Sequence, residues 1–220
     1  VYPWWMFAGQ SIKDRERGKA PDLSNCFVNH KYDNTFKLRS NPNQISAWRR
    51  AADILNNAGI RFWLCAGSVL GHVREGRFLP TDKDVDLGVW AEDRERVSQA
   101  FRDHRLQVTR DRPHQINVSI GGVKIDIHCH YFDSNATPNR SVYFDLHYKG
   151  KVLRHRYPEW CFGVGDHTDL GMAPTVFYLK ETLLPNNIEE YLAIHYGEDW
   201  QTPKSGWKWY SSARNMEVLR

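Results

Sequence analysis

The chain of 220 residues is long enough to bury one hydrophobic core, since 41% of its residues are hydrophobic and 25% are charged. Its formal net charge of +4, from 30 basic and 26 acidic residues, suits an anionic substrate and is too small for a nucleic-acid-binding tail. No apolar run approaches the ~20 residues that span a bilayer. The cysteines are too widely spaced to predict a structural zinc site: Cys26, Cys65, Cys129 and Cys161.

The predicted elements begin after a charged, irregular stretch over residues 1–40. A helix follows, because Asn41 is a favoured N-cap residue and Pro42 suits the first helical position. Apolar residues then recur at helical spacing until Gly59. The β-rich run IRFWLC at 60–65 predicts a short strand, which leads directly into a Gly-Ser pair and a second short helix.

Further along the chain, strands and helices alternate with hairpin signals. DVDLGVW predicts a strand, and AEDRERVSQAFRDH predicts the helix after it. Gly121-Gly122 and Lys149-Gly150 each separate two β-rich runs, so both pairs predict hairpins. NNIEEYLAIHYG predicts the last helix. We therefore expect the α+β class, with helices packed on a small mixed sheet in one domain at 41–205. The irregular segment at 1–40 and an aromatic tail at 206–220 flank this domain.

Acidic residues stand inside the predicted strand that begins at Asp84. Side chains alternate along a strand, so Asp84 and Asp86 point to the same face, where one of them would be protonated unless a cation compensates. Hard carboxylate oxygens favour Mg²⁺ or Mn²⁺. Asp126 lies between two isoleucines of a later strand and would complete a three-carboxylate cluster if the two strands pair. Asp82 is either a further metal ligand or part of the turn before the strand.

The Gly-Ser pair between the first strand and its helix suggests a phosphate-binding turn. Gly67 would let a phosphate approach the backbone, and the Ser68 hydroxyl and the free N–H groups of the helix start would bind its oxygens. Arg74 and Arg77 follow, where either would neutralise phosphate charge. Each of these signals is weak alone. Their order along the chain, with the Asp-x-Asp and a later acid, indicates a functional site.

Three separated pieces of the chain, roughly within residues 45–203, resemble the LicD/fukutin family of the polymerase-β-like nucleotidyltransferase superfamily. They are GSVLGHVREGRFLPTDKDVDLGV, KIDIH and LPNNIEEYLAIHYGEDWQTP. The positions of the first piece that match the family pattern are Gly67, Ser68, Leu70, Gly71, Arg74, Phe78, Pro80, Asp82, Asp84 and Asp86. The chain departs from the family pattern at Thr81 and Lys83. Lys83 puts a cation inside the acidic run, where it would tune metal affinity or contact a phosphate.

The resemblance implies a nucleotidyltransferase (polymerase-β-like) fold and a transferase reaction. A phosphate-linked group, either phosphocholine or a phospho-alditol such as ribitol or glycerol phosphate, moves from a CDP-activated donor to a sugar hydroxyl, and CMP leaves. In this interpretation Asp84 and Asp86 hold the metal on the donor diphosphate. Asp126 binds a second metal or takes the proton of the acceptor. Gly67 and Ser68 hold phosphate oxygens.

The implied partners are a CDP-activated donor and a cell-surface glycan or glycolipid acceptor, as in capsule or teichoic acid synthesis, with no nucleic acid. A bacterial-type relative would work in the cytoplasm at the membrane face, and a eukaryotic one in the Golgi lumen. The chain lacks the cysteine loop that binds zinc in fukutin-related protein, which favours the bacterial type. Since the chain begins without Met, we also keep open an anchor or a further domain outside it.

Two rival enzyme classes use similar residues. A nucleotidyltransferase that moves NMP from an NTP has the same fold and acids, and a glycosyltransferase grips a nucleotide sugar with its Asp-x-Asp. A non-catalytic binding module is a third alternative, although buried acids without a use would be costly to keep. Beside the acids, His128 shares a strand face with Asp126 and would orient a ligand or contact phosphate. His130, on the same face, is expected to be partly exposed.

Overall fold

The computed structural model describes residues 41–135, 140–163 and 172–219, and these residues form one branched sheet with helices packed on it. The helices are α2 (Pro42–Asn57), α3 (Ala66–Glu75), α4 (Arg94–Asp103) and α5 (Ile188–Tyr196), with short 3-10 turns η4 (Ala91–Asp93) and η5 (Glu159–Phe162). The strands are β1 (Phe62–Leu64), β2 (Asp84–Trp90), β3 (Gln107–Arg112), β4 (Gln115–Ile120), β5 (Val123–Asp133), β6 (Ser141–Tyr148), β7 (Lys151–Pro158), β8 (Ala173–Phe177), β9 (Lys180–Leu184) and β10 (Met216–Leu219). The α+β class with a mixed sheet is confirmed, but this sheet of ten described strands is larger than the small one expected.

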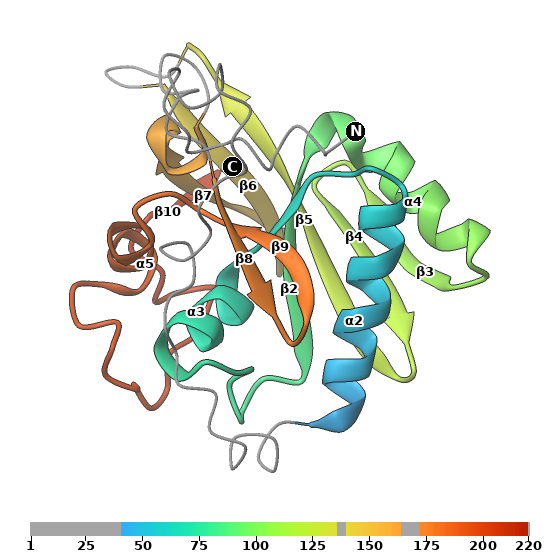
Figure 1. Cartoon of the computed structure of the whole chain (residues 1–220). Helices are drawn as coiled ribbons and strands as arrows, with labels where there is room; N and C mark the ends of the chain where they lie inside the picture. Colours follow the sequence, from blue (N-terminus) through green and yellow to red (C-terminus); the bar gives the residue numbers. More distant parts are fainter. Residues whose placement is uncertain (1–40, 136–139, 164–171, 220) are drawn as a thin grey trace, which may run out of the picture.

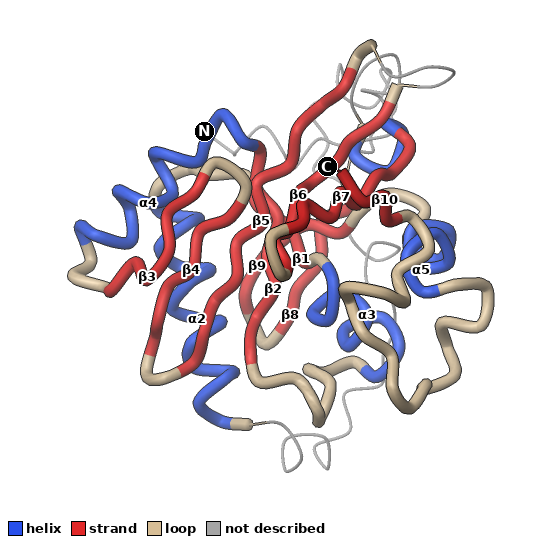
Figure 2. The backbone as a smooth tube through the Cα atoms, turned by 180° about the vertical axis from the view of Figure 1, so that it is seen from behind, coloured by secondary structure: helices blue, strands red, loops and turns tan. Residues whose placement is uncertain are grey.

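Strand β5 is the branch point of the sheet. The main path runs β10-β7-β6-β5-β2-β1-β9-β8, and β4 pairs with the free side of β5 and carries β3 at its edge. The first part of β5 lies between β2, which runs parallel to it, and β4, which runs antiparallel. Its last residues pair instead with β6. Figure 2 shows this long strand passing from the β2–β4 region into the β6–β7 hairpin.

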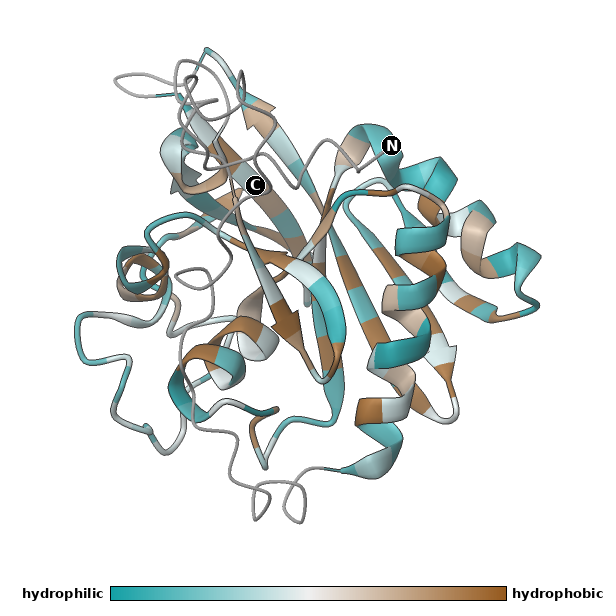
Figure 3. Cartoon of the chain, in the orientation of Figure 1, coloured by the Kyte–Doolittle hydropathy of each residue, from teal (hydrophilic) through white to brown (hydrophobic). Residues whose placement is uncertain are grey.

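One face of the sheet is apolar and covered by helices. Alternate residues of the central strands are buried there, and α2 and α4 pack against β2, β3, β4 and β5. The apolar residues of this face are Val85, Leu87, Val89, Ile116, Val118, Ile125 and Ile127. Figure 1 shows α2 and α4 in front of these strands, and Figure 3 shows brown and teal residues alternating along β4 and β5. The opposite face therefore receives the polar members of the same strands.

Helix α2 is tied to the sheet at two points. Its first turn sends the Gln44 side chain to the backbone carbonyl of Asp84, where Nε2 donates at 2.6 Å. One turn further along, the fully buried Trp48 donates its indole N–H to the carbonyl of Phe177 at 2.8 Å. The predicted N-cap is confirmed, because the Asn41 side chain accepts the N–H of Asn43. The Gln44 contact holds the start of β2 in place, and the Trp48 contact holds the end of β8.

The two predicted hairpins and the four predicted helices are present, but the strands β8, β9 and β10 were missed. The β8–β9 hairpin turns at Tyr178 and Leu179, which both adopt positive φ (45° and 68°) without the glycine or asparagine that signals such a turn. Strand β10 is short and lies in the expected aromatic tail, yet it pairs with β7. The expected irregular segment at 1–40 lies outside the described residues. In the described part of the chain, no helix has both the length and the apolar character needed to cross a bilayer.

Gly88 makes room for a buried indole on the polar face of β2. It stands opposite Trp63 of β1, and a Cβ at Gly88 would lie 2.1 Å from the Trp63 indole nitrogen. The indole is fully buried and packs against Trp90 and His130, so it has no space to retreat. Position 88, two residues after Asp86, therefore accepts only glycine.

We expect Gly88→Ala to lower the free energy of unfolding by about 1–3 kcal/mol, because the added methyl overpacks a rigid site. Urea unfolding of the purified protein would measure this loss. The double variant Gly88→Ala/Trp63→Phe should lose less than the sum of the two single variants, since the smaller ring opens the space. A strictly additive result would contradict the close contact.

Candidate metal centre

Three carboxylates meet at the start of the parallel pair β2–β5. The register of this pair sets Asp86 directly opposite Asp126 and Asp84 opposite Lys124, with all four side chains on the polar face. Each of the three acids offers an oxygen within 4.8 Å of the others. Asp126 is only 7% exposed, while Asp84 and Asp86 are partly buried. The sequence predicted these three acids as one cluster, and the structure brings them together.

Two residues that the sequence did not single out contact Asp126. Asn117 of β4 stands opposite Asp126, and its amide nitrogen donates to Oδ1 of that carboxylate. The ammonium of Lys124 lies 2.7 Å from Oδ2 of Asp126 and 3.0 Å from Oδ2 of Asp84. A signal for both was present, because the two-residue turn at Gly121-Gly122 sets the pairing of β4 with β5. From that register, Asn117 and Lys124 fall on the face of Asp126.

Asp86 is held by the first turn of α3. Its Oδ2 accepts the backbone N–H of Gly67 at 3.1 Å, and its own N–H donates to the hydroxyl oxygen of Ser68 at 2.8 Å. On the other side, Nε2 of His128 lies 3.4 Å from Oδ1. Burial raises the pKa of Asp86, and the charge of Asp84 adds to this, while the hydrogen bond with His128 opposes it. A carboxylate in this position is stabilised by any further positive charge.

The turn between β1 and α3 allows this close approach. Ala66 takes a left-handed conformation, with φ at 43°, where the chain leaves the strand and starts the helix. At Gly67 a Cβ would lie 2.1 Å from Oδ2 of Asp82 and 3.2 Å from Oδ2 of Asp86. The helix N-terminus therefore meets two carboxylates at a position where a side chain does not fit. Its partial positive charge favours both of them as anions.

Asp82 lies in the turn before β2 and also adjoins the cluster. Its N–H donates to the carbonyl of Leu79 at 3.0 Å, which closes the turn. Burial and the charges of Asp86 and Asp84 together raise the pKa of Asp82 to about 7, against the opposing charge of Arg74. Both readings of this residue hold in part, because it belongs to the turn and its carboxyl group faces the other acids. It is not one of the three acids that come within reach of a common ion.

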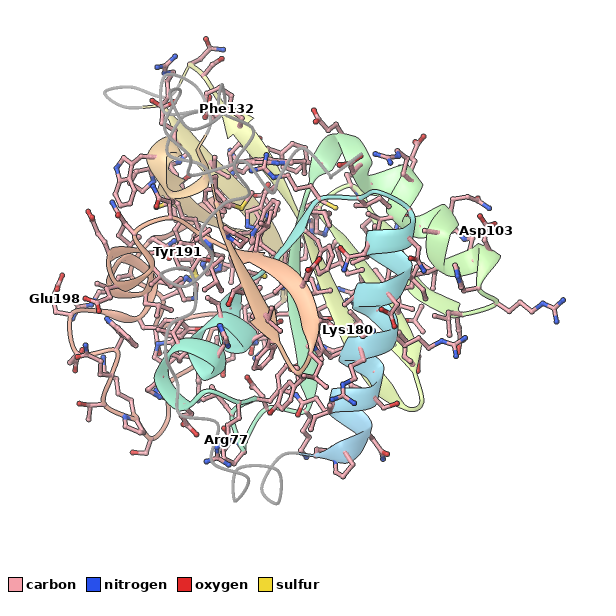
Figure 4. The ribbon with its side chains drawn as sticks, viewed as in Figure 1. Arg77, Asp103, Phe132, Lys180, Tyr191 and Glu198 are labelled. Atoms are coloured by element: carbon pink, nitrogen blue, oxygen red, sulfur yellow. The ribbon has the colours of Figure 1, made fainter. Side chains whose placement is uncertain are left out.

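The other residues predicted to bind phosphate lie around this centre but differ in their burial and their contacts. Ser68 is 1% exposed, and its hydroxyl oxygen is used by Asp86. Arg74 and Arg77 both contact the carboxylate of Glu75, at 3.1 and 3.0 Å, and Arg74 also donates to the carbonyl of Trp200. Figure 4 shows Arg77 in the loop that follows α3. Lys83 is exposed beside the acids.

Two histidines on β5 differ from what the sequence suggested. His130 was expected on a partly exposed face, but it is 1% exposed and packs against Trp63, Phe144 and Phe162. That expectation was wrong, because the β6–β7 hairpin and η5 cover the upper part of the polar face. His128 is also buried and reaches Asp86, and its expected part in orienting a ligand or contacting phosphate stays a prediction. The aromatic tail is divided, with Trp207 packed on Tyr196 and Trp209 exposed.

The acid cluster fits a divalent cation. Its ligand set is three carboxylates, which are the hard oxygen donors that Mg²⁺ and Mn²⁺ prefer. Burial raises the pKa of Asp86 and of Asp82, so a positive charge here would stabilise the ionised carboxylates. Lys124 supplies one such charge. Across the ranges 41–135, 140–163 and 172–219, these acids form the one group of three metal-binding side chains this close together.

Comparison with known families identifies this region of the chain. The model of the LicD/FKTN/FKRP nucleotidyltransferase domain matches residues 59–161, which include β1, α3, β2 and β5 with all three acids. Residues 59–161 thus carry the nucleotidyltransferase domain of the LicD/fukutin family. The family resemblance expected from the three sequence pieces is confirmed, and with it the nucleotidyltransferase fold.

Curated relatives carry the same family names. A ribitol-5-phosphate transferase FKTN from Macaca fascicularis is 28% identical over 177 residues, which cover 76% of this chain and 35% of that protein. A ribitol 5-phosphate transferase FKRP from Mus musculus is 49% identical over 45 residues, or 20% of this chain and 9% of that protein. The chain thus spans about a third of the length of the FKTN relatives that it matches.

Similarity to solved structures is weak. The solution structure of the antibiotic-resistance factor ANT(2'')-Ia has a TM-score of 0.46 at 13% identity, and it covers 75% of this chain and 76% of that one. The lincosamide adenylyltransferase LnuA has a TM-score of 0.44 at 12% identity, covering 67% of this chain and 82% of that one. Likeness at this level does not extend to the chemistry of the LicD-type site.

The raised pKa of Asp82 predicts a pH dependence of stability for the metal-free protein. Between the ordinary pKa of 3.8 and the folded value of about 7, the folded state holds a proton that the unfolded state has lost. Stability should therefore fall as the pH rises through this window. Thermal unfolding in EDTA would show it, and Asp82→Asn should flatten the slope and raise the melting temperature above about pH 7 by at least about 2 °C.

Asp103→Asn is the matched control, because Asp103 is exposed on α4, far from the acid cluster (Figure 4). It should keep the pH profile of the original protein. An Asp82→Asn profile that retains the full slope would contradict the assignment.

Proposed function

We propose that this chain is the catalytic domain of a metal-dependent phospho-group transferase. It would move a phosphate-linked group, a phospho-alditol such as ribitol or glycerol phosphate or else phosphocholine, from a CDP-activated donor to a sugar hydroxyl. The observation that carries the proposal is the cluster of Asp84, Asp86 and Asp126 at the β2–β5 pair. The LicD/fukutin domain at residues 59–161 and the names of the ribitol-phosphate transferases that the chain resembles support the choice of transferred group.

The reaction balances as a phosphoryl substitution. The acceptor hydroxyl oxygen forms a bond to the phosphorus that carries the alditol, the bond from that phosphorus to the bridging oxygen of the diphosphate breaks, and CMP leaves. The hydroxyl proton passes to a carboxylate. Asp126 is suited to accept it on Oδ2, because Asn117 holds Oδ1 and orients the carboxylate. Positioning and charge neutralisation supply most of the catalysis in such transfers.

Asp84 and Asp86 would hold Mg²⁺ or Mn²⁺ against the donor diphosphate. The cation, when bound, neutralises diphosphate charge and makes the phosphorus a better electrophile. The chain prepares Asp86 for this role through the N–H of Gly67 and the hydroxyl of Ser68. The first contact aims the carboxylate and restricts its rotation, and the second fixes the backbone of Asp86.

The donor phosphates would lie at the start of α3. Gly67 and Ser68 are at the helix N-terminus, which attracts anions, and Lys83 is exposed beside the acids. Arg74 and Arg77 would contribute positive charge after exchanging Glu75 for phosphate oxygens. The acceptor would be a glycan or glycolipid. The protein would work either at the cytoplasmic membrane face or in the Golgi lumen, wherever its acceptor is found.

We expect Asp84→Asn, Asp86→Asn and Asp126→Asn each to lower the transfer rate about a thousandfold or more, because each removes a charge that the metal or the proton transfer needs. Circular dichroism should show that the fold is kept, since the acids contribute to charge rather than to the core. Asp103→Asn serves again as the control. Full transfer by the Asp86→Asn protein, or transfer that persists in excess EDTA, would contradict the metal mechanism.

A donor screen tests the substrate class. With Mg²⁺ present, CDP-linked alcohols should raise the melting temperature, because a ligand that binds only the folded state stabilises it. NTPs and UDP-sugars at the same concentration should raise it less. Stabilisation by NTPs alone would indicate NMP transfer, and stabilisation by UDP-sugars alone would indicate a glycosyltransferase.

A further inference from the structure

Lys124 bridges two of the three acids of the centre. Its ammonium lies 3.0 Å from Oδ2 of Asp84 and 2.7 Å from Oδ2 of Asp126. We propose that Lys124 is a displaceable counter-ion that occupies the centre when no divalent cation is bound and leaves when one enters. In this way it sets the cation concentration at which the centre fills. This inference rests on the proposed metal centre and adds to it a residue that controls occupancy.

The ammonium and a divalent cation compete for the same oxygens. The three acids converge, with oxygens within 4.8 Å of one another. Lys124 contacts two of these acids, at Oδ2 of Asp84 and Oδ2 of Asp126. A cation bound between Asp84 and Asp126 would meet the ammonium at contact distance, where two positive charges repel strongly. The two cations therefore exclude each other from this position.

Lys124 can leave without disturbing the fold. Its side chain is 52% exposed, and it stands at the start of β5, two residues after the Gly121-Gly122 turn. A lysine ammonium is strongly hydrated and sits on a flexible stem, so half-exposed ion pairs of this kind contribute little. A lysine ammonium is the charged form at ordinary pH, so it remains a competitor for these oxygens.

The other contacts of the acids do not compete in this way. Asn117 holds Oδ1 of Asp126, not the oxygen that Lys124 contacts, and it is 6% exposed. Gly67 and Ser68 hold Asp86 through backbone groups of β2 and α3. These partners stay in place whether or not a cation is bound. Among the groups that contact the three acids in the described residues, Lys124 combines positive charge with freedom to move.

The choice of lysine over arginine matters for the exchange. A guanidinium would bind the two carboxylates through a rigid fork and would be harder to displace. Lys124→Arg should therefore weaken cation binding, whereas Lys124→Gln, which keeps most of the stem and removes the charge, should strengthen it. Opposite shifts from two substitutions at one position separate competition from a general loss of structure.

The test measures Mn²⁺ binding by titration calorimetry with no donor present and at low ionic strength. We expect Lys124→Gln to bind Mn²⁺ about tenfold more tightly than the original protein and Lys124→Arg to bind it more weakly. The melting temperature of Lys124→Gln in EDTA should be lower than that of the original protein, and Mn²⁺ should raise it by a larger amount. These readouts do not depend on transfer activity.

Arg105→Gln is the matched control, because Arg105 is exposed two residues after Asp103 and its loss changes the net charge of the protein by the same amount. Its Mn²⁺ affinity should change by less than about threefold, since exposed charges are screened. Mn²⁺ binding that is unchanged or weaker in Lys124→Gln would overturn the role of Lys124 while leaving the metal centre standing. Mn²⁺ binding that is absent from the original protein and both Lys124 variants would overturn the metal centre and the inference together.

Discussion

The parallel pairing of β2 with β5 is the constraint on which the rest of the site depends. It sets Asp86 opposite Asp126 on one face, while the same strands bury Val85, Leu87 and Ile127 on the other. A slip of one residue would move the acids into the core and the aliphatic side chains into the site, so burial of the apolar face also protects the register of the acids. Stability and the geometry of the site thus come from the same pairing.

The carboxylates that this register brings together repel one another, and groups from α3, β4 and β5 compensate their charge. The N-terminus of α3 offers the N–H of Gly67, β4 offers the amide of Asn117, and the base of β5 offers the ammonium of Lys124. Only the last of these carries a full charge, and only it is half exposed. The N–H of Gly67 and the amide of Asn117 are fixed dipoles that orient the carboxylates. The ammonium of Lys124 is a movable cation that a metal ion can displace.

The predictions from the sequence were best where local patterns act through short-range geometry. The Asn41 cap, the hairpins at Gly121-Gly122 and Lys149-Gly150, and the alternation of acids in β2 all depend on neighbours in the chain. The β8–β9 hairpin was missed because Tyr178 and Leu179 adopt positive φ without the usual turn residues. His130 was misjudged because the elements that cover it, β6, β7 and η5, come later in the chain.

The sequence by itself determined the family, the class of fold and the identity of the three acids, since an acid framed by apolar residues in a strand is unfavourable without a partner. Only the tertiary structure decided how these acids are compensated. Ser68 and Gly67 hold Asp86, Asp82 both closes a turn and adjoins the cluster, and Lys124 bridges Asp84 and Asp126. The contacts of Gly67 and Ser68 with Asp86, and of Lys124 with Asp84, join residues that are distant in the chain. They follow from the pairing of β2 with β5 and from the placement of α3, which no local pattern encodes.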